Sequence, residues 1–145
     1  MALRASGSID ALTHALTPLL SYLGIDPALI LLAPALSKLA EAGYLAGLPV
    51  VEEIFADRAY LDDGQLVPRS RPDAMIHGAE ASLAHVSAML DEQALISVTG
   101  RRLPCTIGSV CVHGDGPDAV RTARFLREEL LHRGYRLAPL ELLQA

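Results

Sequence analysis

Two short clusters of ionisable residues have the types and the positions that chemistry requires. They are residues 57–60 (DRAY) and residues 113–116 (HGDG), which follow the apolar runs at residues 48–55 and 109–112. If both runs are parallel strands, their carboxyl ends meet at the same edge of a sheet, where α/β proteins bind their ligands. The sequence therefore predicts one site that draws on both clusters.

The second cluster has the residue types of a turn that binds anions or transfers protons. His113 is able to shuttle a proton, and Asp115 is able to orient the imidazole or to bind a metal. Gly114 and Gly116 permit close approach of a ligand to the backbone, and the helix that follows presents free N–H groups and its positive dipole end. The alternative interpretation is a tight turn in which Asp115 only caps the helix.

The first cluster also has two interpretations. Asp57 and Arg58 are either a pair that anchors a substrate or an internal ion pair that ties a loop to the sheet. Glu52 and Glu53 precede them within the expected strand, and alternation turns one of these two carboxylates inward. An inward carboxylate in an apolar strand is either paired or functional.

Residues 57–73 form a polar, turn-rich segment, and a loop of this length in a compact domain is usually functional. Within it, Arg69 and Arg71 either clamp a carboxylate or phosphate or remain solvated. His77 and His85 lie around an expected helix, and we interpret them as surface or rim residues.

Composition excludes several classes of function. The 145 residues are 51% hydrophobic with a net charge of −5, and only 4% are aromatic. The chain therefore has neither the basic surface nor the stacking aromatics of a nucleic-acid-binding protein. Its uncharged runs are shorter than the roughly 20 apolar residues of a membrane span, and its first ten residues lack the apolar core of a signal peptide. We expect a cytoplasmic protein without a nucleic-acid or membrane partner.

Metal and nucleotide motifs are not apparent in the sequence. Cys105, Cys111 and His113 lack the spacing of a zinc site, so we assign no metal ligands. Neither a P-loop nor a dinucleotide-binding fingerprint occurs. Two cysteines do not make a disulfide framework.

Hydrophobic periodicity predicts strands and helices in alternation, within a single domain over residues 1–145. The expected helices cover residues 8–23, 35–46, 80–90 and 116–133, and the expected strands cover residues 28–32, 48–55, 109–112 and 135–138, with a small hairpin at residues 94–98 and 102–105. Gly116 is the expected N-cap of the last helix, with Pro117 at its first position and Gly134 at its end. This order predicts the α/β class with a mainly parallel sheet.

Two longer motifs carry a resemblance to a known family. Residues 53–69 (EIFADRAYLDDGQLVPR) and residues 110–120 (VCVHGDGPDAV) resemble two stretches of the LamB/YcsF family, in the same order along the chain. The resemblance implies a partial parallel β/α barrel of the polysaccharide-deacetylase-like type, about half to two-thirds of a full barrel. The whole chain then resembles the C-terminal part, or second half, of such a barrel.

The sequence also departs from the family's pattern. Members of the family have about 250 residues, the size of a complete barrel, and their opening motifs, rich in acidic and histidine residues, are not found here. Gly116 stands where threonine is usual, and His85 stands where glutamine is expected. A partial barrel leaves sheet edges and an apolar inner face uncovered. We therefore expect a missing barrel half, a homo-oligomer partner or a rearranged compact fold to cover them.

The function implied by the resemblance is that of the A subunit of the bacterial ATP-dependent oxoprolinase, here in a short or split form. That enzyme opens oxoproline (pyroglutamate) to glutamate together with subunits B and C, so ATP is the implied co-substrate, and a divalent metal is left open. The implied catalytic residues are His113, Asp115, Asp57 and Glu53. The implied residues for substrate or phosphate binding are Arg58, Tyr60, Arg69, Gly114 and Gly116.

Two other hypotheses remain beside the enzyme. The chain is either a catalytically inactive, truncated relative that acts as a binding or scaffold subunit, or an unrelated α/β module that binds anions. The absence of the opening motifs favours the first of these for the isolated chain, whereas the second requires both motif matches to be coincidental. Ionisable residues at two strand ends favour the enzyme, because scaffolding alone gives no reason for them.

Overall fold

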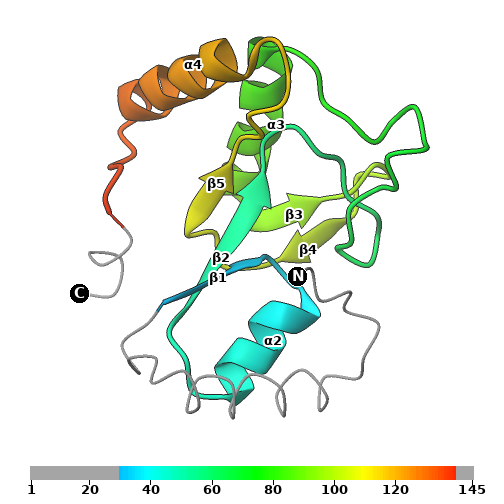
Figure 1. Cartoon of the computed structure of the whole chain (residues 1–145), viewed down its shortest axis with the longest axis vertical. Helices are drawn as coiled ribbons and strands as arrows, with labels where there is room; N and C mark the ends of the chain where they lie inside the picture. The colour runs from blue at the N-terminus through cyan, green and yellow to red at the C-terminus, as the bar shows by residue number, and fades with distance from the viewer. Residues whose placement is uncertain (1–29, 140–145) are drawn as a thin grey trace.

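The structure is a computed structural model that describes residues 30–139 of the chain (Figure 1). Its elements in chain order are β1 (Leu31–Pro34), α2 (Lys38–Leu45), β2 (Val50–Phe55), α3 (Ala79–Glu92), β3 (Ala94–Ile96), β4 (Arg102–Pro104), β5 (Ser109–Cys111) and α4 (Ala119–His132). The fold is of the α/β class, as predicted. The helix expected at residues 8–23 lies outside the described residues.

Three parallel strands form the main sheet, in the order β1-β2-β5. β2 is central, so β1 and β5 are the edges of this sheet in the described part of the chain. The strand predicted at residues 28–32 is observed at Leu31–Pro34. Pro34 is tolerated at its end because an edge strand can leave one N–H position unpaired. The parallel sheet agrees with the prediction.

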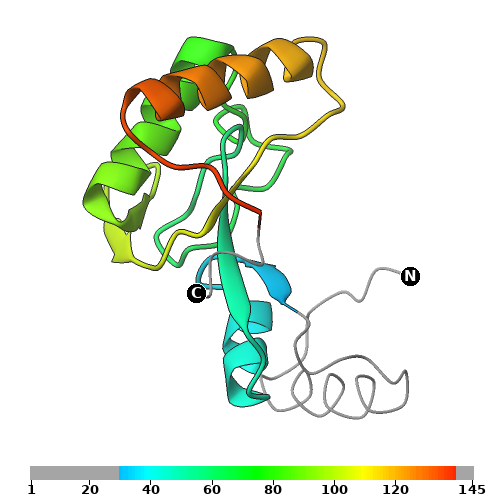
Figure 2. The same cartoon turned by 90° about the vertical axis from the view of Figure 1, so that its left-hand side faces the viewer.

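One face of this sheet packs against the helices. Ile54 of β2 is fully buried, in a core that includes Val86 of α3 and Leu126 of α4. α2 packs on the same face, so closely that a Cβ atom added at Gly43 would lie 2.5 Å from Leu31 Cδ2. Figure 2 shows α3 and α4 against each other at one end of the molecule and α2 at the other.

The opposite face of the sheet carries a different set of side chains, and we call it the open face. Strand alternation and register place on it Leu32, Val51, Glu53, Phe55 and Cys111. Leu32 is 40% exposed, and Glu53, Phe55 and Cys111 are half-buried. This face therefore presents both apolar surface and a carboxylate near the carboxyl end of β2.

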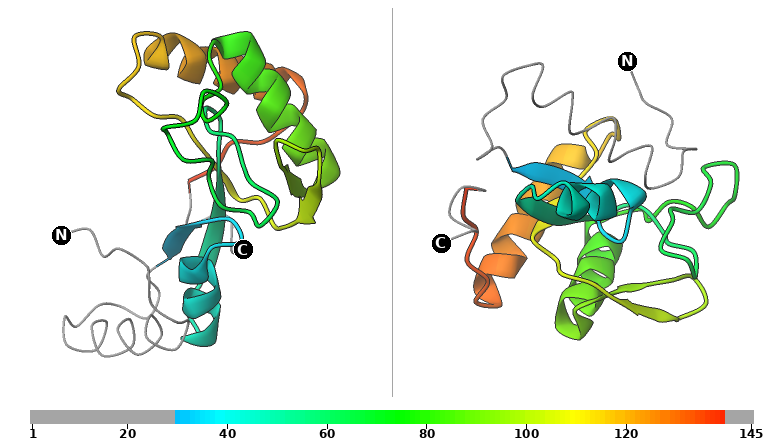
Figure 3. Two further views of the ribbon diagram at one scale, coloured as in Figure 1. Left: turned by 90° about the vertical axis from the view of Figure 1, so that its right-hand side faces the viewer. Right: turned by 90° about the horizontal axis from the view of Figure 1, so that it is seen from below.

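β3 and β4 form the small antiparallel hairpin that the sequence predicts, with Leu95 opposite Leu103. Gly100 in its turn has a φ of 83°, a backbone conformation that favours glycine. Figure 3 shows the hairpin beside the loop that follows β2. The two are joined by a hydrogen bond, because Val98 N–H donates to the carbonyl oxygen of Tyr60.

The prediction for the start of the last helix is wrong by two residues. α4 begins at Ala119, and its N-cap is Asp118, whose side chain makes no capping hydrogen bond within the described residues. Pro117 belongs instead to a turn, in which the Gly116 carbonyl oxygen accepts from Ala119 N–H at 3.2 Å. The predicted stop is confirmed, since Gly134 has a φ of 87° directly after the helix.

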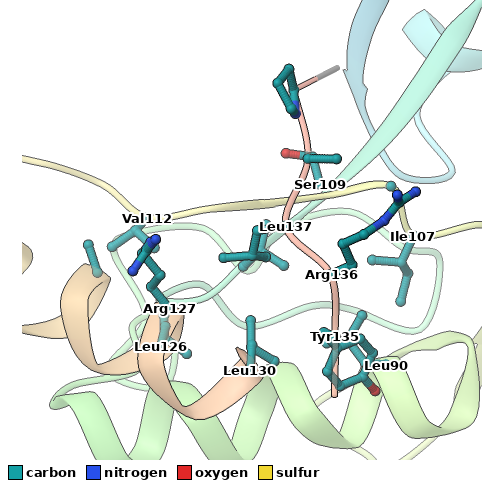
Figure 4. A pocket seen from close by; sticks show the side chains of 15 residues that line it. Leu90, Ile107, Ser109, Val112, Leu126, Arg127, Leu130, Tyr135, Arg136 and Leu137 are labelled. Carbon is teal, nitrogen blue, oxygen red and sulfur yellow. The ribbon is translucent and has the colours of Figure 1, made fainter. Parts of the chain in front are cut away.

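The strand predicted at residues 135–138 is also wrong. Tyr135 N–H turns back to the carbonyl oxygen of Leu130 at 3.0 Å and so completes the end of α4 instead of pairing with a strand. The residues that follow pass the edge of β5. A pocket of about 670 Å³ lies between these residues, β5 and α4 (Figure 4). Its walls are mainly apolar and include Leu126 and Val112.

Candidate active site

The segment between β2 and α3 is folded back on itself. Ala59 N–H donates to the carbonyl oxygen of Ala74 at 3.1 Å, and Val67 N–H donates to that of Ala59 at 2.9 Å. The side chains of these three residues form a small buried cluster of their own. The loop predicted at residues 57–73 is therefore held in a defined conformation in which its first residues extend from β2.

The ends of β2 and β5 bring an aspartate and a histidine together. His113 Nδ1 lies 2.7 Å from Asp57 Oδ1 and 3.0 Å from Asp57 Oδ2. The His113 ring also stacks on Phe55, with ring centroids 5.6 Å apart. The two sequence clusters therefore meet, as expected, at the carboxyl edge of the parallel sheet.

This pair has the geometry of an oriented base. A carboxylate only accepts hydrogen bonds, so Asp57 accepts from the Nδ1–H of His113 and leaves the lone pair of the neutral imidazole on Nε2. The His113 side chain is 27% exposed and that of Asp57 is 17% exposed. Asp57 is thus the more protected of the two, while His113 remains open to a reactant.

Glu53 and Cys111 lie near this pair on the open face. Burial raises the pKa of the Glu53 carboxyl, and the charge of His113 acts in the opposite direction. Burial also raises the pKa of the Cys111 thiol, and the negative charges of Glu53 and Asp57 raise it further. The site therefore contains two carboxylates, with the imidazole close to both.

Glu52 has a structural role instead. Its Oε2 accepts from Leu36 N–H at 3.0 Å, and its Oε1 accepts from the Tyr44 hydroxyl at 2.9 Å. Burial raises the pKa of Tyr44, and the Glu52 carboxylate raises it further. The first bond holds Leu36 in a left-handed conformation, with a φ of 58°, between β1 and α2. The two neighbouring glutamates thus serve opposite faces of the sheet.

Asp115 does not orient His113 in the structure, because Asp57 occupies that position. The Asp115 carboxylate lies 3.9 Å from Arg69 Nη1, and both side chains are more than half exposed. A Cβ atom added at Gly114 or Gly116 would meet nothing within 4 Å in the described part of the chain, so no neighbouring side chain there requires a glycine. This turn and Arg69 therefore lie together at the rim, in contact with solvent.

Arg58 and Tyr60 lie inside the fold. The Arg58 side chain is buried, and its Nη2 donates to the carbonyl oxygen of Val67 at 2.9 Å, while its Nε has no hydrogen-bond partner among residues 30–139. The Tyr60 hydroxyl oxygen accepts from Phe55 N–H at 2.8 Å, and burial raises the pKa of this phenol. Arg58 thus ties the loop together, through a carbonyl and not through the carboxylate of Asp57.

Arg71, the other arginine considered in the loop, lies on the surface. Its Nη2 is 2.5 Å from Asp73 Oδ2, and both side chains are more than two-fifths exposed. This arginine therefore pairs with a neighbour in its own loop.

His85 is more buried than the predicted surface or rim position. It is half-buried on α3, its Nε2 lies 3.0 Å from the Arg58 carbonyl oxygen, and its ring stacks on Tyr60. Burial lowers the pKa of this imidazole. Helical spacing could have predicted this burial, because His85 lies three residues after Ser82 and directly before Val86, and both of these residues are buried on α3. His77 is exposed, as expected.

Residues 30–139 contain no cluster of three or more histidine, cysteine, aspartate or glutamate side chains arranged to hold a metal ion. None of the helices in this part of the chain combines the length and the apolar character needed to cross a membrane.

The protein is of the α/β class, with a parallel sheet that carries an aspartate–histidine pair at its carboxyl edge. The chain belongs to the LamB/YcsF family, whose model matches residues 9–145. This membership confirms the prediction from the two motifs.

Several relatives of the chain are named as subunits of an oxoprolinase. The chain is 46% identical over 120 residues to the A subunit of 5-oxoprolinase from Nitrobacter winogradskyi, a match that covers 83% of this chain and 47% of the relative. It is 49% identical over 115 residues to the protein of that name from Azorhizobium caulinodans, with 79% and 46% covered. The chain thus spans about half the length of these relatives.

A solved structure shows the same fold. The lactam utilization protein from Thermus thermophilus superposes with a TM-score of 0.74 at 30% sequence identity. The match covers 91% of this chain and 51% of that protein.

Proposed function

We propose that the chain is a short or split form of the A subunit of 5-oxoprolinase, which hydrolyses the lactam of oxoproline to glutamate with subunits B and C. The observation that carries this proposal is the Asp57–His113 pair at the carboxyl edge of the sheet. It is supported by the names of the relatives, since 5-oxoprolinase and lactam utilization both refer to cyclic amides.

His113 acts in this scheme as the general base and then as the general acid. Its Nε2 takes a proton from the water that attacks the lactam carbonyl carbon, and Asp57 stabilises the imidazolium that forms. When the ring C–N bond breaks, the same proton passes to the leaving nitrogen, which becomes the amino group of glutamate. The Glu53 carboxylate adds negative charge near the imidazolium.

The chain matches about half of each relative, and we infer that the proposed site also draws on groups from the other half of the fold. We infer that β1, β2 and β5 form an arc of a parallel β/α barrel of the polysaccharide-deacetylase-like type. Three observations support this inference. Helices cover one face of the sheet, the sheet has two edges within the described residues, and the match covers about half of each relative. We propose that the part of the relatives without a match here corresponds to the other strands and supplies the remaining groups around His113.

ATP is proposed as the co-substrate of the complete assembly. When bound, it supplies the free energy that drives opening of a stable lactam. The turn after β5 fits a polyphosphate poorly, because it combines Arg69 with two carboxylates, those of Asp115 and Asp118. We therefore place nucleotide binding outside this turn.

The test is glutamate release from oxoproline in an assembly of this chain, its complementing half, subunits B and C, and ATP. His113→Gln and Asp57→Asn are expected to lower kcat by about 10²-fold to 10⁴-fold, since each removes part of the oriented base. His132→Gln is the matched control, because His132 is a largely exposed histidine on α4. Full activity of H113Q in this assembly would overturn the proposed mechanism.

The second candidate function is a catalytically inactive scaffold subunit. It is favoured by the names of the relatives as A subunits, because a subunit contributes contacts to its partners whether or not it carries out the reaction. A scaffold would bind subunits B and C with equal affinity in the wild-type chain and in H113Q. It would also leave glutamate release at the level seen without it, and this result separates the two candidates.

A further inference from the structure

A hydrogen bond from α3 reaches the backbone next to the aspartate of the site. His85 Nε2 lies 3.0 Å from the carbonyl oxygen of Arg58, the residue that directly follows Asp57. A carbonyl oxygen only accepts, so His85 Nε2 carries the proton of this bond. Burial lowers the pKa of His85, which keeps the ring neutral at physiological pH. The carbonyl of Asp57 itself accepts from Ile76 N–H at 2.9 Å.

The same histidine is linked to His113 through two aromatic rings. His85 stacks on Tyr60 with ring centroids 6.1 Å apart and an interplanar angle of 23°. The Tyr60 hydroxyl accepts from Phe55 N–H, and the Phe55 ring stacks on His113 at an interplanar angle of 17°. The contacts therefore form a closed ring, in which both members of the Asp57–His113 pair connect to α3.

We propose that His85 is a positioning residue of the Asp57–His113 pair, whose hydrogen bond to the Arg58 carbonyl keeps the Asp57 carboxylate against His113 Nδ1. Two consecutive carbonyl groups, those of Asp57 and Arg58, are then fixed by partners from different segments, which sets the direction of the Asp57 side chain. The consequence for catalysis rests on the proposed function, whereas the effect on the pair itself does not.

The proposed role of His85 requires a hydrogen-bond donor at the position of its Nε2, within reach of the Arg58 carbonyl oxygen. The groups that face it are the Tyr60 ring, the Arg58 carbonyl and the charge of Asp57. In His85→Gln the side-chain amide is able to place an N–H near the position of Nε2, whereas the shorter side chain of His85→Asn places it near Nδ1. The two variants thus have the same polarity and differ in whether the Arg58 carbonyl is reached.

The experiment is imidazole ¹⁵N NMR of the full chain, which identifies the protonated nitrogen of His113. In the wild type and in H85Q we expect one neutral tautomer, protonated at Nδ1. In H85N we expect a mixture of tautomers, together with a fall in kcat of about tenfold and little change in KM in the complete assembly. His77→Asn is the matched control, since His77 is an exposed histidine that precedes the same helix.

The outcomes separate this inference from the proposed function. A single Nδ1–H tautomer in H85N, or loss of that tautomer in both H85N and H85Q, would overturn the positioning role. If the tautomer follows the expected pattern but the wild-type assembly releases no glutamate, the positioning role stands and the proposed function fails. Should H85N not fold, as judged by circular dichroism, His85→Met replaces it, because methionine fills the buried site without a donor.

Discussion

Asp57 and His113 meet because each lies two residues beyond a paired position of the sheet. Phe55 and Cys111 are Cα partners at the ends of β2 and β5, and the chain leaves both strands in the same direction. The contact between the two side chains is therefore set by strand register, and not by the flexibility of a long side chain. Phe55 adds to this order by stacking on the imidazole.

The depressed pKa of His85 predicts a pH dependence of stability. Burial lowers its pKa in the folded chain below the value of about 6.5 that holds in the unfolded chain. Below pH 6.5 the unfolded chain therefore binds a proton that the folded chain does not, and stability is lost as the pH falls toward the folded pKa. Urea denaturation at pH 7.5, 6.5 and 5.5, values chosen to span roughly one unit on either side of 6.5, measures this loss.

The comparison variant for this effect is H85Q, which has no titrating group at that position. Its free energy of unfolding is expected to fall less steeply over the same range than that of the wild type. Equal slopes in the two proteins would show that His85 titrates alike in the folded and unfolded states.

The sequence placed both clusters at strand ends, but it did not identify the partner of His113. Asp115 is two residues away along the chain and Asp57 is 56 residues away, so proximity in sequence favoured the wrong carboxylate. The correct choice requires the register between β2 and β5, which a single sequence does not contain. Glu53 was assigned to the site by resemblance, and alternation with the buried Glu52 agrees with that assignment.

At the scale of elements, the loop after β2 depends on the hairpin beside it. Asp62 Oδ1 accepts from Ser97 Oγ at 2.5 Å and from Thr99 Oγ1 at 2.6 Å. These hydrogen bonds hold the pKa of the Asp62 carboxyl below its usual value. The turn between β3 and β4 therefore anchors the part of the loop that follows Tyr60.

Ser97→Ala is expected to loosen this anchor without unfolding the domain. Ser97 is buried, and its Oγ also accepts from Thr99 N–H and Arg101 N–H, so its removal leaves several groups without a partner. Hydrogen exchange should become several-fold faster at the Val98 amide, which bonds to the Tyr60 carbonyl. Ser70→Ala is the control, because Ser70 is an exposed serine of the same loop. An unchanged rate at Val98 in S97A would show that the loop is held by other contacts.

The order of elements was predictable, whereas their ends were not. Apolar runs and periodicity identified the three strands of the sheet, the hairpin and α2, α3 and α4. The strand expected at residues 135–138 does not form, because Tyr135 N–H bonds to the Leu130 carbonyl oxygen at the end of α4. The hydropathy pattern does not distinguish this hydrogen bond from pairing with a neighbouring strand. The predicted start of α4 is wrong because Pro117 fits a turn as well as it fits a first helical position.

The whole molecule presents an open face on the side away from its helices. Leu32 is 40% exposed on this face, which also carries Glu53, and β1 has a free edge in the described part of the chain. An exposed apolar side chain on a sheet face beside a free strand edge marks a surface that another polypeptide segment is able to cover. Since the chain spans about half the length of its relatives, we propose that a polypeptide carrying the other half of the fold covers this face.

Leu32→Lys is therefore expected to weaken association with a polypeptide that carries the other half of a relative. Desolvating a lysine in place of a leucine at this interface should raise Kd by at least about tenfold. Leu131→Lys is the matched control, because Leu131 is 41% exposed but belongs to α4, away from the open face. Sedimentation velocity of mixtures over a range of concentrations measures both values. Equal affinity of L32K and L131K would exclude the open face as the contact surface, and the partner would then have to bind elsewhere, the pocket beside β5 being the next surface to test.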